Sequence, residues 1–262
     1  MTILEMQAKK GKEKISMITC YDYTSALLAA QSSVDVVLVG DSLANTMHGH
    51  PTTLPATVPM MALHTQAVAR GLNGQKLLVG DLPFLSYRQD LRSNVRATGR
   101  LMVAGAQAVK LEGARGNTDL IRHLADSGVP VMGHLGLTPQ SVHQLGGFKV
   151  QGKNPEAYER ILQDAHALEE AGCFSIVLEC VPEKLGAQIT RELKIPTIGI
   201  GAGAETDGQV LVWQDLLGLN PGFRPKFVRP FAELGAVVKK ALNDYDSQVK
   251  NGGFPSAKES YT

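Results

Sequence analysis

The chain has 262 residues, 44% of them hydrophobic, and 26 lysine and arginine residues against 25 aspartate and glutamate residues. This length suits one large domain or two small ones, with enough apolar residues for a sizeable core. The net charge of +1 argues against a nucleic-acid-binding protein and against an acidic tail.

Short β-branched runs alternate with amphipathic or alanine-rich segments along the chain. We expect strands at residues 15–21, 34–39, 76–80, 108–112, 129–133, 174–179, 197–201 and, on a weaker pattern, 210–213. We expect helices at 25–31, 58–70, 91–104, 118–127, 155–170, 182–193 and 231–249. The segment from about residue 250 onward is interpreted as an exposed arm, or as one ordered on a neighbouring subunit.

Strands that alternate with helices indicate parallel βαβ units. The strands are continuous apolar runs, as is typical of strands covered on both faces. Eight units in about 250 residues favour a (β/α)8 barrel, with an open doubly wound sheet as the alternative. No linker or repeat marks a second domain, so we expect one domain over residues 1–262 that ends in the C-terminal arm.

Several buried runs end on a carboxylate. The runs VVLVGDSL, LLVGDLPF and AVKLEG end at Asp41, Asp81 and Glu112. Because barrel active sites lie at the C-terminal ends of the strands, these side chains can converge. Three oxygen ligands without a nearby cysteine suit Mg²⁺ better than Mn²⁺ or Ca²⁺. For Asp41 alone, capping of the following helix is the alternative.

Lys110 and Glu112 lie two residues apart, so the period of a strand places both on one face. A buried lysine at this position can hold a substrate carboxylate or a developing enolate oxygen; a structural ion pair with Glu112 is the alternative. Glu179 ends the run SIVLEC and is interpreted as a general base. Its alternative role is to complement the dipole of the following helix.

Three histidine and glycine motifs carry weaker signals. His134, in GHLGLTPQS, can bind a substrate or help protonate a product, and a structural histidine is the alternative. The HGH motif at residues 48–50 offers two imidazoles to a metal, but without a third ligand nearby a structural role in a loop is favoured. GIGAGA, at 199–204, formally fits a dinucleotide motif; we discount it because no clear helix follows it.

The cysteines and the N-terminus indicate the compartment. Cys20, Cys173 and Cys180 are odd in number and form no Cys-x-x-Cys pair, which argues against a disulfide framework. The sequence shows neither a secretory signal nor an apolar span. We therefore expect a cytoplasmic protein without a membrane partner. A catalytic thiol is the alternative role for Cys180, but the sequence shows no activating partner for it.

The motifs GDSL through TLPAT, DLPF, VKLEG, GHLGLTPQS, KVQG, LECVP and IGIGAG occur in an order that covers nearly the whole chain. As a set, the chain resembles the ketopantoate hydroxymethyltransferase (3-methyl-2-oxobutanoate hydroxymethyltransferase) family. The resemblance implies a (β/α)8 TIM barrel of the phosphoenolpyruvate/pyruvate-like group. It also implies small-molecule substrates, Mg²⁺, and 5,10-methylenetetrahydrofolate as co-substrate. Members of this family are commonly decamers, so a homodecamer is expected.

The resemblance also implies roles for particular residues. It implies Mg²⁺ bound by Asp41, Asp81 and Glu112, and Glu179 as the proton acceptor. The residues expected to bind the substrate are Asp41, Ser42, Asp81, Lys110 and, from its motif, His134. An aldolase or lyase that acts on an α-keto acid without folate is the competing enzyme class. A catalytically silent barrel is the non-enzyme alternative, and the intact set of charged residues argues against it.

Overall fold

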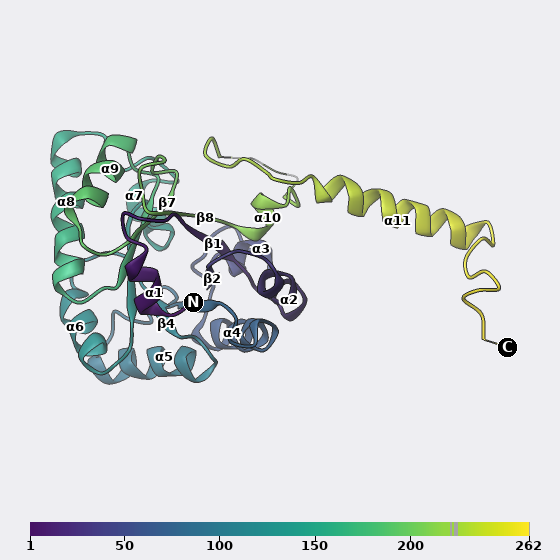
Figure 1. Cartoon of the computed structure of the whole chain (residues 1–262), viewed down its shortest axis with the longest axis horizontal. Coiled ribbons are helices and arrows are strands. Elements are labelled where there is room, and N and C mark those ends of the chain that lie inside the picture. Colours follow the sequence, from purple (N-terminus) through teal and green to yellow (C-terminus); the bar gives the residue numbers. More distant parts are fainter. Residues whose placement is uncertain (221, 223–224, 262) are drawn as a thin grey trace. The chain divides into compact units, whose positions relative to one another are not determined.

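The computed structural model describes residues 1–220, 222 and 225–261. The chain divides into two compact units, Met1–Leu211 and Val212–Thr262. The first unit is a closed barrel of parallel strands in which each strand pairs with its neighbours in sequence and β8 pairs with β1 (Figure 1). The expected (β/α)8 class is therefore confirmed.

The elements of the barrel follow the expected alternation closely. The strands are β1 (Ile15–Thr19), β2 (Val36–Val39), β3 (Leu77–Asp81), β4 (Ala108–Lys110), β5 (Val131–Gly136), β6 (Ser175–Glu179), β7 (Thr197–Ile200) and β8 (Gly208–Leu211). The helices of the first unit are α1 (Ile3–Ala8), α2 (Tyr23–Gln31), α3 (Leu43–Thr46), α4 (Val58–Leu72), α5 (Leu91–Val103), α6 (Thr118–Asp126), α7 (Val142–Leu145), α8 (Pro155–Glu170) and α9 (Glu183–Glu192), with a 3₁₀ turn η1 at Pro139–Ser141.

The structure differs from the expected elements in several places, among them the unexpected short helices α3 and α7. Helix α1 was not expected, although Thr2 and Glu5 form a capping box that starts it. Strand β8 begins two residues earlier than the predicted 210–213. No helix separates β7 from β8, because the glycine-rich segment of residues 201–207 leads directly from one strand to the next. This arrangement agrees with the rejection of a dinucleotide motif at residues 199–204.

The apolar strands form the core because both of their faces are covered. Every residue of β2 is buried, and Val36 and Leu38 belong to the hydrophobic core cluster. Helices surround the strands on the outside of the barrel (Figure 1). We call the C-terminal end of the barrel, with the loops that follow the strands, the mouth. Several helices begin at a side-chain cap directly after one of these loops. Asp22, Thr57, Asp90 and Asn154 each accept a hydrogen bond from a backbone N–H in the first turn. These caps fix where the loops end and so shape the mouth.

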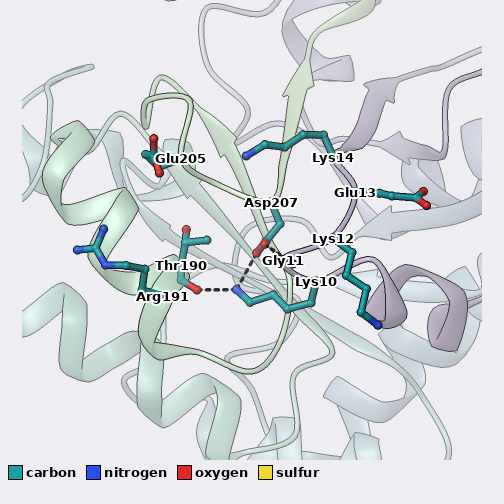
Figure 2. A pocket seen from close by; sticks show the side chains of 9 residues that line it. All are labelled: Lys10, Gly11, Lys12, Glu13, Lys14, Thr190, Arg191, Glu205 and Asp207. Carbon is teal, nitrogen blue, oxygen red and sulfur yellow. Dashed lines mark hydrogen bonds and ion pairs between the residues drawn. The ribbon is translucent and has the colours of Figure 1, made fainter.

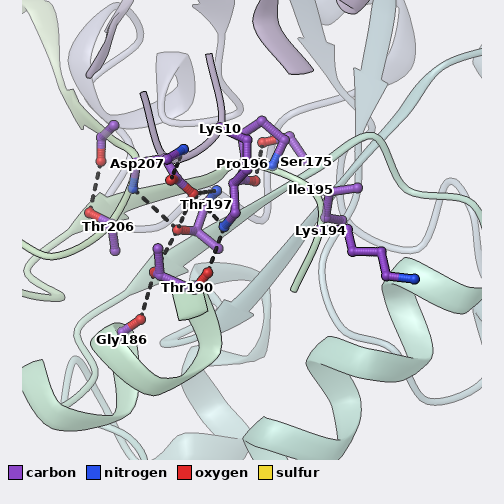
Figure 3. Close-up of polar contacts among 12 residues, drawn as sticks. Lys10, Ser175, Gly186, Thr190, Lys194, Ile195, Pro196, Thr197, Thr206 and Asp207 are labelled. Carbon is purple, nitrogen blue, oxygen red and sulfur yellow. Dashed lines mark hydrogen bonds and ion pairs between the residues drawn. The ribbon is translucent and has the colours of Figure 1, made fainter. Parts of the chain in front are cut away.

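The N-terminal end of the barrel is closed by a buried carboxylate. Asp207 is 5% exposed and accepts hydrogen bonds from Lys10 Nζ at 2.7 Å and from the backbone N–H of Thr197 at 2.9 Å (Figure 3). Lys10 Nζ also donates to the carbonyl of Thr190 at 2.6 Å. These bonds join the segment before β1 to β7 and α9, so they tie the first strand of the barrel to the last ones.

A cavity of about 380 Å³ lies beside this closure, as Figure 2 shows. Four cationic side chains line it, but two of them are already engaged. Lys10 pairs with Asp207, and Lys14 Nζ donates to the carbonyls of Ala204 and Thr206. Active sites of such barrels lie at the opposite end, and residues at this end contribute to stability. We interpret this end as structural.

The second unit contains two helices among its described residues. They are α10 (Trp213–Leu216) and α11 (Leu234–Lys250). The described residues after α11, 251–261, are all exposed. A single domain over residues 1–262 stays a prediction. Within the described residues, none of the helices is both long enough and apolar enough to cross a membrane.

The contacts of Lys10 at this end of the barrel predict that replacing it lowers the stability of the protein. Lys10→Met should lower the free energy of unfolding by about 1.5 kcal/mol, the lower end of the range for a hydrogen bond to a charged group. The lower end applies because the Lys10 side chain is 18% exposed. Urea denaturation measures this change. Lys12→Met is the matched control, since Lys12 is exposed on the same segment, and equal stability of the two variants would contradict the prediction.

Candidate active site

Six ionisable side chains meet at the C-terminal end of the barrel. They come from consecutive strands β2 to β6, either within the strand or up to two residues after it: Asp41, Asp81, Lys110, Glu112, His134 and Glu179. The first five are at most 4% exposed. The structure therefore brings together the ionisable side chains that the sequence singled out, as the barrel geometry predicts.

The central contact of the site is an ion pair between neighbouring strands. Asp81 and Lys110 are register partners in β3 and β4, and Lys110 Nζ lies 2.8 Å from Asp81 Oδ1. The alternative ion pair between Lys110 and Glu112 is not the closest contact of Lys110. Asp81 also reaches the preceding strand, because its Oδ2 accepts a hydrogen bond from the backbone N–H of Asp41 at 3.1 Å.

His134 connects the other half of the site. Its Nδ1 lies 3.3 Å from Lys110 Nζ and 3.4 Å from Glu112 Oε1. Its Nε2 lies 3.2 Å from Glu179 Oε2. The imidazole thus stands between the carboxylates of Glu112 and Glu179.

Gln140 closes the network into a ring, and the sequence analysis missed it. Its backbone N–H donates to Glu112 Oε2 at 3.1 Å, and its side-chain Nε2 donates to Asp41 Oδ2 at 2.8 Å. Its own oxygen accepts a hydrogen bond from the Tyr87 hydroxyl at 2.7 Å. Gln140 follows β5 within GHLGLTPQS, so its position on a mouth loop was the available signal.

The backbone makes room for these contacts at two glycines. A Cβ on Gly40 would lie 2.7 Å from Ser42 Oγ, so a side chain there would push the Ser42 hydroxyl out of its present position. Gly136 has a φ of +92°, and a Cβ there would lie 2.2 Å from the carbonyl oxygen of Glu179. Position 136 therefore requires glycine.

Ser42 lies at the edge of the ring. Its Oγ is 2.8 Å from the hydroxyl of Tyr21, a buried side chain just after β1. Burial raises the pKa of Tyr21 to about 12, so this hydroxyl stays protonated near neutral pH. The pair presents a neutral hydrogen-bonding group beside the charged ring.

Burial in this ring perturbs several protonation equilibria. Burial, with repulsion from Asp81 and Glu112, raises the pKa of Asp41 to about 8. Burial also raises the pKa of Asp81, although Lys110 opposes this. Burial and Lys110 disfavour a charged His134, but hydrogen bonds to Glu112 and Glu179 outweigh them and raise its pKa to about 9. Excess buried negative charge on the carboxylates is therefore the main electrostatic problem of the site.

A divalent cation would balance this excess of buried negative charge. Asp41, Asp81 and Glu112 supply hard oxygen donors, which Mg²⁺ prefers, and a cation would relieve the repulsion that raises the pKa of Asp41. Among the residues that the structure describes, no three His, Cys, Asp or Glu side chains are grouped so as to hold a metal by themselves. Mg²⁺ usually keeps water and substrate oxygens as further ligands, so the residues fit such an ion without a closed protein cage.

Two other candidates lie outside the ring. Burial, with a smaller contribution from Glu179, raises the pKa of Cys180 to about 12, which argues against a thiolate nucleophile. The HGH loop acquires a neighbour that the sequence did not reveal. His48 Nε2 lies 3.1 Å from Nε2 of His64, whose Nδ1 is 2.6 Å from the carbonyl of Tyr21. These contacts tie the loop to α4 and to the end of β1.

Comparisons with known proteins agree with this geometry. The family described as ketopantoate hydroxymethyltransferase matches residues 1–257. A 3-methyl-2-oxobutanoate hydroxymethyltransferase of Bdellovibrio bacteriovorus is 59% identical over 100% of this chain and 99% of its own length. A protein of the same name from Coxiella burnetii is 58% identical over 94% of this chain and 93% of its own length.

A solved structure supports the fold. Phosphonopyruvate hydrolase in complex with oxalate and Mg²⁺ matches with a TM-score of 0.61 at 12% identity, covering 99% of this chain and 93% of that one. At such low identity the likeness concerns the fold alone. The family match and the high identity of the curated relatives go further. The chain belongs to the ketopantoate hydroxymethyltransferase family and is an enzyme of hydroxymethyl transfer to 3-methyl-2-oxobutanoate.

Proposed function

We propose that the donor is 5,10-methylenetetrahydrofolate and that the reaction passes through an enolate of 3-methyl-2-oxobutanoate. The products are 2-dehydropantoate and tetrahydrofolate, on the route to pantothenate and coenzyme A. The observation that carries this proposal is the buried ring, in which Lys110 and His134 stand among carboxylates that come from successive strands. Such a ring is suited to form and stabilise an oxyanion.

We assign the metal-binding role to Asp41, Asp81 and Glu112 and take Mg²⁺ as the ion. When bound, the ion supplies Lewis-acid stabilisation of the negative charge that develops on the keto oxygen. The high pKa of Asp41 in the metal-free ring supports the need for a cation. The phosphonopyruvate hydrolase of the same fold, solved with oxalate and Mg²⁺, is consistent with this assignment.

Glu179 is the proposed general base. It ends β6 and its side chain is 17% exposed, so the carboxylate borders both the buried ring and the open mouth. His134 Nε2, 3.2 Å away, orients this carboxylate. Glu179 takes the proton from C3 of the keto acid, and the C3 carbon then attacks the one-carbon unit of the donor. Both bonds from that unit to the folate nitrogens break in the course of the reaction. One water supplies the hydroxyl group of the product, and the two folate nitrogens take up the proton lost from C3 and the remaining proton of that water.

Lys110 offsets the charge of the enolate. Burial opposes its protonation, but the surrounding carboxylates outweigh burial and raise its pKa, so it is a cation throughout the neutral range. A fixed cation next to the reacting oxygen stabilises charge without the cost of reorienting solvent. Asp81 holds the ammonium in place at 2.8 Å. Ser42 and Asp41, at the other side of the ring, are the remaining proposed substrate contacts.

We also propose that the enzyme works as a homo-oligomer, most simply the decamer that the family resemblance implies, in the cytoplasm. Helix α11 supports the first point, because Val237, Val238, Leu242 and Tyr245 are all exposed on it, and such apolar residues favour burial in an interface. All three cysteines are free and buried, which is compatible with a reducing compartment.

The metal assignment predicts the behaviour of an Asp81 variant. Asp81→Asn should weaken Mg²⁺ binding by at least about tenfold, since one charged donor is lost, and turnover should nearly vanish. Titration calorimetry of the metal-free protein with Mg²⁺ measures the first effect. Asp126→Asn, an exposed aspartate on α6, is the matched control. Full activity of a metal-stripped sample in excess chelator would contradict the assignment.

The pKa of Asp41 predicts how the stability of the metal-free protein depends on pH. Its folded pKa of about 8 lies above its ordinary 3.8. Between these values the folded protein holds a proton that the unfolded chain has released, so the free energy of unfolding falls as pH rises. Asp41→Asn removes this contribution, which is at most about 1.4 kcal/mol per pH unit.

Denaturation between about pH 5 and pH 6.5 measures this difference between the two proteins. Above that window His134 also lowers the free energy of unfolding as pH rises, because its ordinary pKa is 6.5 and its folded pKa is about 9. Saturating Mg²⁺ should stabilise the wild-type protein more at the upper end of this window than at the lower end. Identical pH dependence of the Asp41→Asn and wild-type proteins would show that Asp41 is already ionised in the metal-free site.

The role of Glu179 predicts a half-reaction. With Mg²⁺ and no folate, the enzyme should exchange the C3 proton of 3-methyl-2-oxobutanoate for deuterium in D₂O. Glu179→Gln should slow this exchange by roughly 10²–10⁴, the usual effect of a positioned acid–base group. An NMR time course of the C3 signal measures it, with Glu183→Gln, an exposed glutamate at the start of α9, as control. If the Glu179→Gln variant exchanged the C3 proton at the wild-type rate, Glu179 would not be the base, and His134 would be the next candidate.

A further inference from the structure

A second hollow lies directly beside the ring. This cavity, of about 320 Å³, is lined by Phe84, Leu85, Tyr87, Arg88, Gln140 and Gln144, among others. We call it the Phe84 cavity. Its volume is within the range of sites for small organic molecules, ~300–1,000 Å³. The residues come from the loop that follows β3 and from the segment that follows β5, so the cavity belongs to the mouth of the barrel.

The Phe84 cavity shares two side chains with the catalytic ring. Gln140 lines the cavity and donates to Asp41 Oδ2 at 2.8 Å. Tyr87 also lines it and donates to Gln140 Oε1 at 2.7 Å. The inner wall of the cavity is therefore one side chain away from the proposed metal and substrate site. A molecule bound there would lie beside the proposed keto-acid site, with Gln140 between them.

The lining suits a flat heterocycle with polar edges. Phe84 and Leu85 are 40% and 50% exposed, which leaves apolar surface open at the mouth. The guanidinium of Arg88 lies 5.7 Å from the centre of the Tyr87 ring, and it is held by the carbonyl of Arg115 at 2.6 Å. Gln144 adds an amide donor and acceptor. Aromatic faces favour stacking, and the amide and guanidinium groups favour hydrogen bonds at a ring edge.

The loop that carries Phe84 is held in an unusual conformation. Leu85 has a φ of +59°, the left-handed region that non-glycine residues rarely adopt. Such a conformation is retained where the surroundings enforce it, commonly at binding sites. The same loop contains Ser86, whose backbone N–H donates to the carbonyl of Pro83 at 3.0 Å. The loop therefore presents Phe84 and Leu85 in a defined arrangement.

We propose that the Phe84 cavity binds the pteridine ring of the reduced-folate donor, with Phe84 as the stacking surface and Gln144 and Arg88 at the polar edge of the ring. This assignment rests on the proposed function. The keto acid is the less suitable occupant because its proposed contacts are the buried carboxylates and Lys110, which Gln140 separates from the cavity. The donor is the larger substrate and needs the open space that adjoins them.

The test measures donor binding and keto-acid activation separately. Tetrahydrofolate is titrated into the Mg²⁺-loaded enzyme with the keto acid absent, under anaerobic conditions, by calorimetry. Phe84→Ala should weaken binding by roughly tenfold, as expected for loss of an aromatic stack. Gln144→Trp, which places a bulky ring on the wall of the cavity, should weaken it at least as much. Leu63→Ala, an exposed apolar residue of α4, is the control and should bind as the wild type does.

The folate-free exchange of the C3 proton is the second measurement. It involves the keto acid alone, so Phe84→Ala and Gln144→Trp should exchange at close to the wild-type rate, which also shows that both variants are folded. The KM for the donor should rise in both variants while the KM for the keto acid stays within about twofold of the wild-type value.

Two results would overturn the assignment while leaving the proposed function intact. One is tetrahydrofolate binding of wild-type strength in both cavity variants. The other is a raised KM for the keto acid with slowed proton exchange, which would place the keto acid in the cavity. A wild-type enzyme that neither binds tetrahydrofolate nor uses its methylene derivative would instead refute the proposed donor, and the cavity assignment with it. The wild-type measurement alone distinguishes that case.

Discussion

The ion pair between Asp81 and Lys110 is the interaction around which the catalytic mouth is organised. The two residues are register partners on adjacent parallel strands, and their charged atoms lie 2.8 Å apart in a buried environment. Neither charge would be tolerated there alone. Together they still leave an excess of negative charge, because Asp41 and Glu112 are buried beside them. This imbalance explains the raised pKa of Asp41 and the suitability of the site for a cation and an enolisable acid.

The rest of the barrel holds this unfavourable group of charges in place. The apolar strands fix the register that places Asp81 opposite Lys110, and the closure by Lys10 and Asp207 holds the first and last strands together at the far end. At the mouth, Gln140 donates to two carboxylates at once. A site of like charges is strained by nature, and the hydrophobic core and these hydrogen bonds offset that cost.

The same arrangement relates the two halves of the reaction. Gln140 lies between the ring, where the keto acid is proposed to lose its proton, and the Phe84 cavity, where the donor is proposed to bind. Tyr87 contacts both the amide of Gln140 and the backbone of Glu112. The C3 carbon that loses its proton must also reach the one-carbon unit, so the reaction requires each substrate to be held in a defined orientation toward the other.

The sequence by itself determined the barrel and the charged residues of its mouth, because hydrophobic runs alternate with helical segments and each run ends at the same face of a parallel barrel. It could not determine which charges meet. Lys110 pairs with Asp81 rather than Glu112, and His64 approaches the HGH loop, through strand register and helix packing that no local pattern encodes. Gln140 was missed for the same reason: a neutral side chain in a loop gains its role only from the carboxylates that folding brings within 3.1 Å of it.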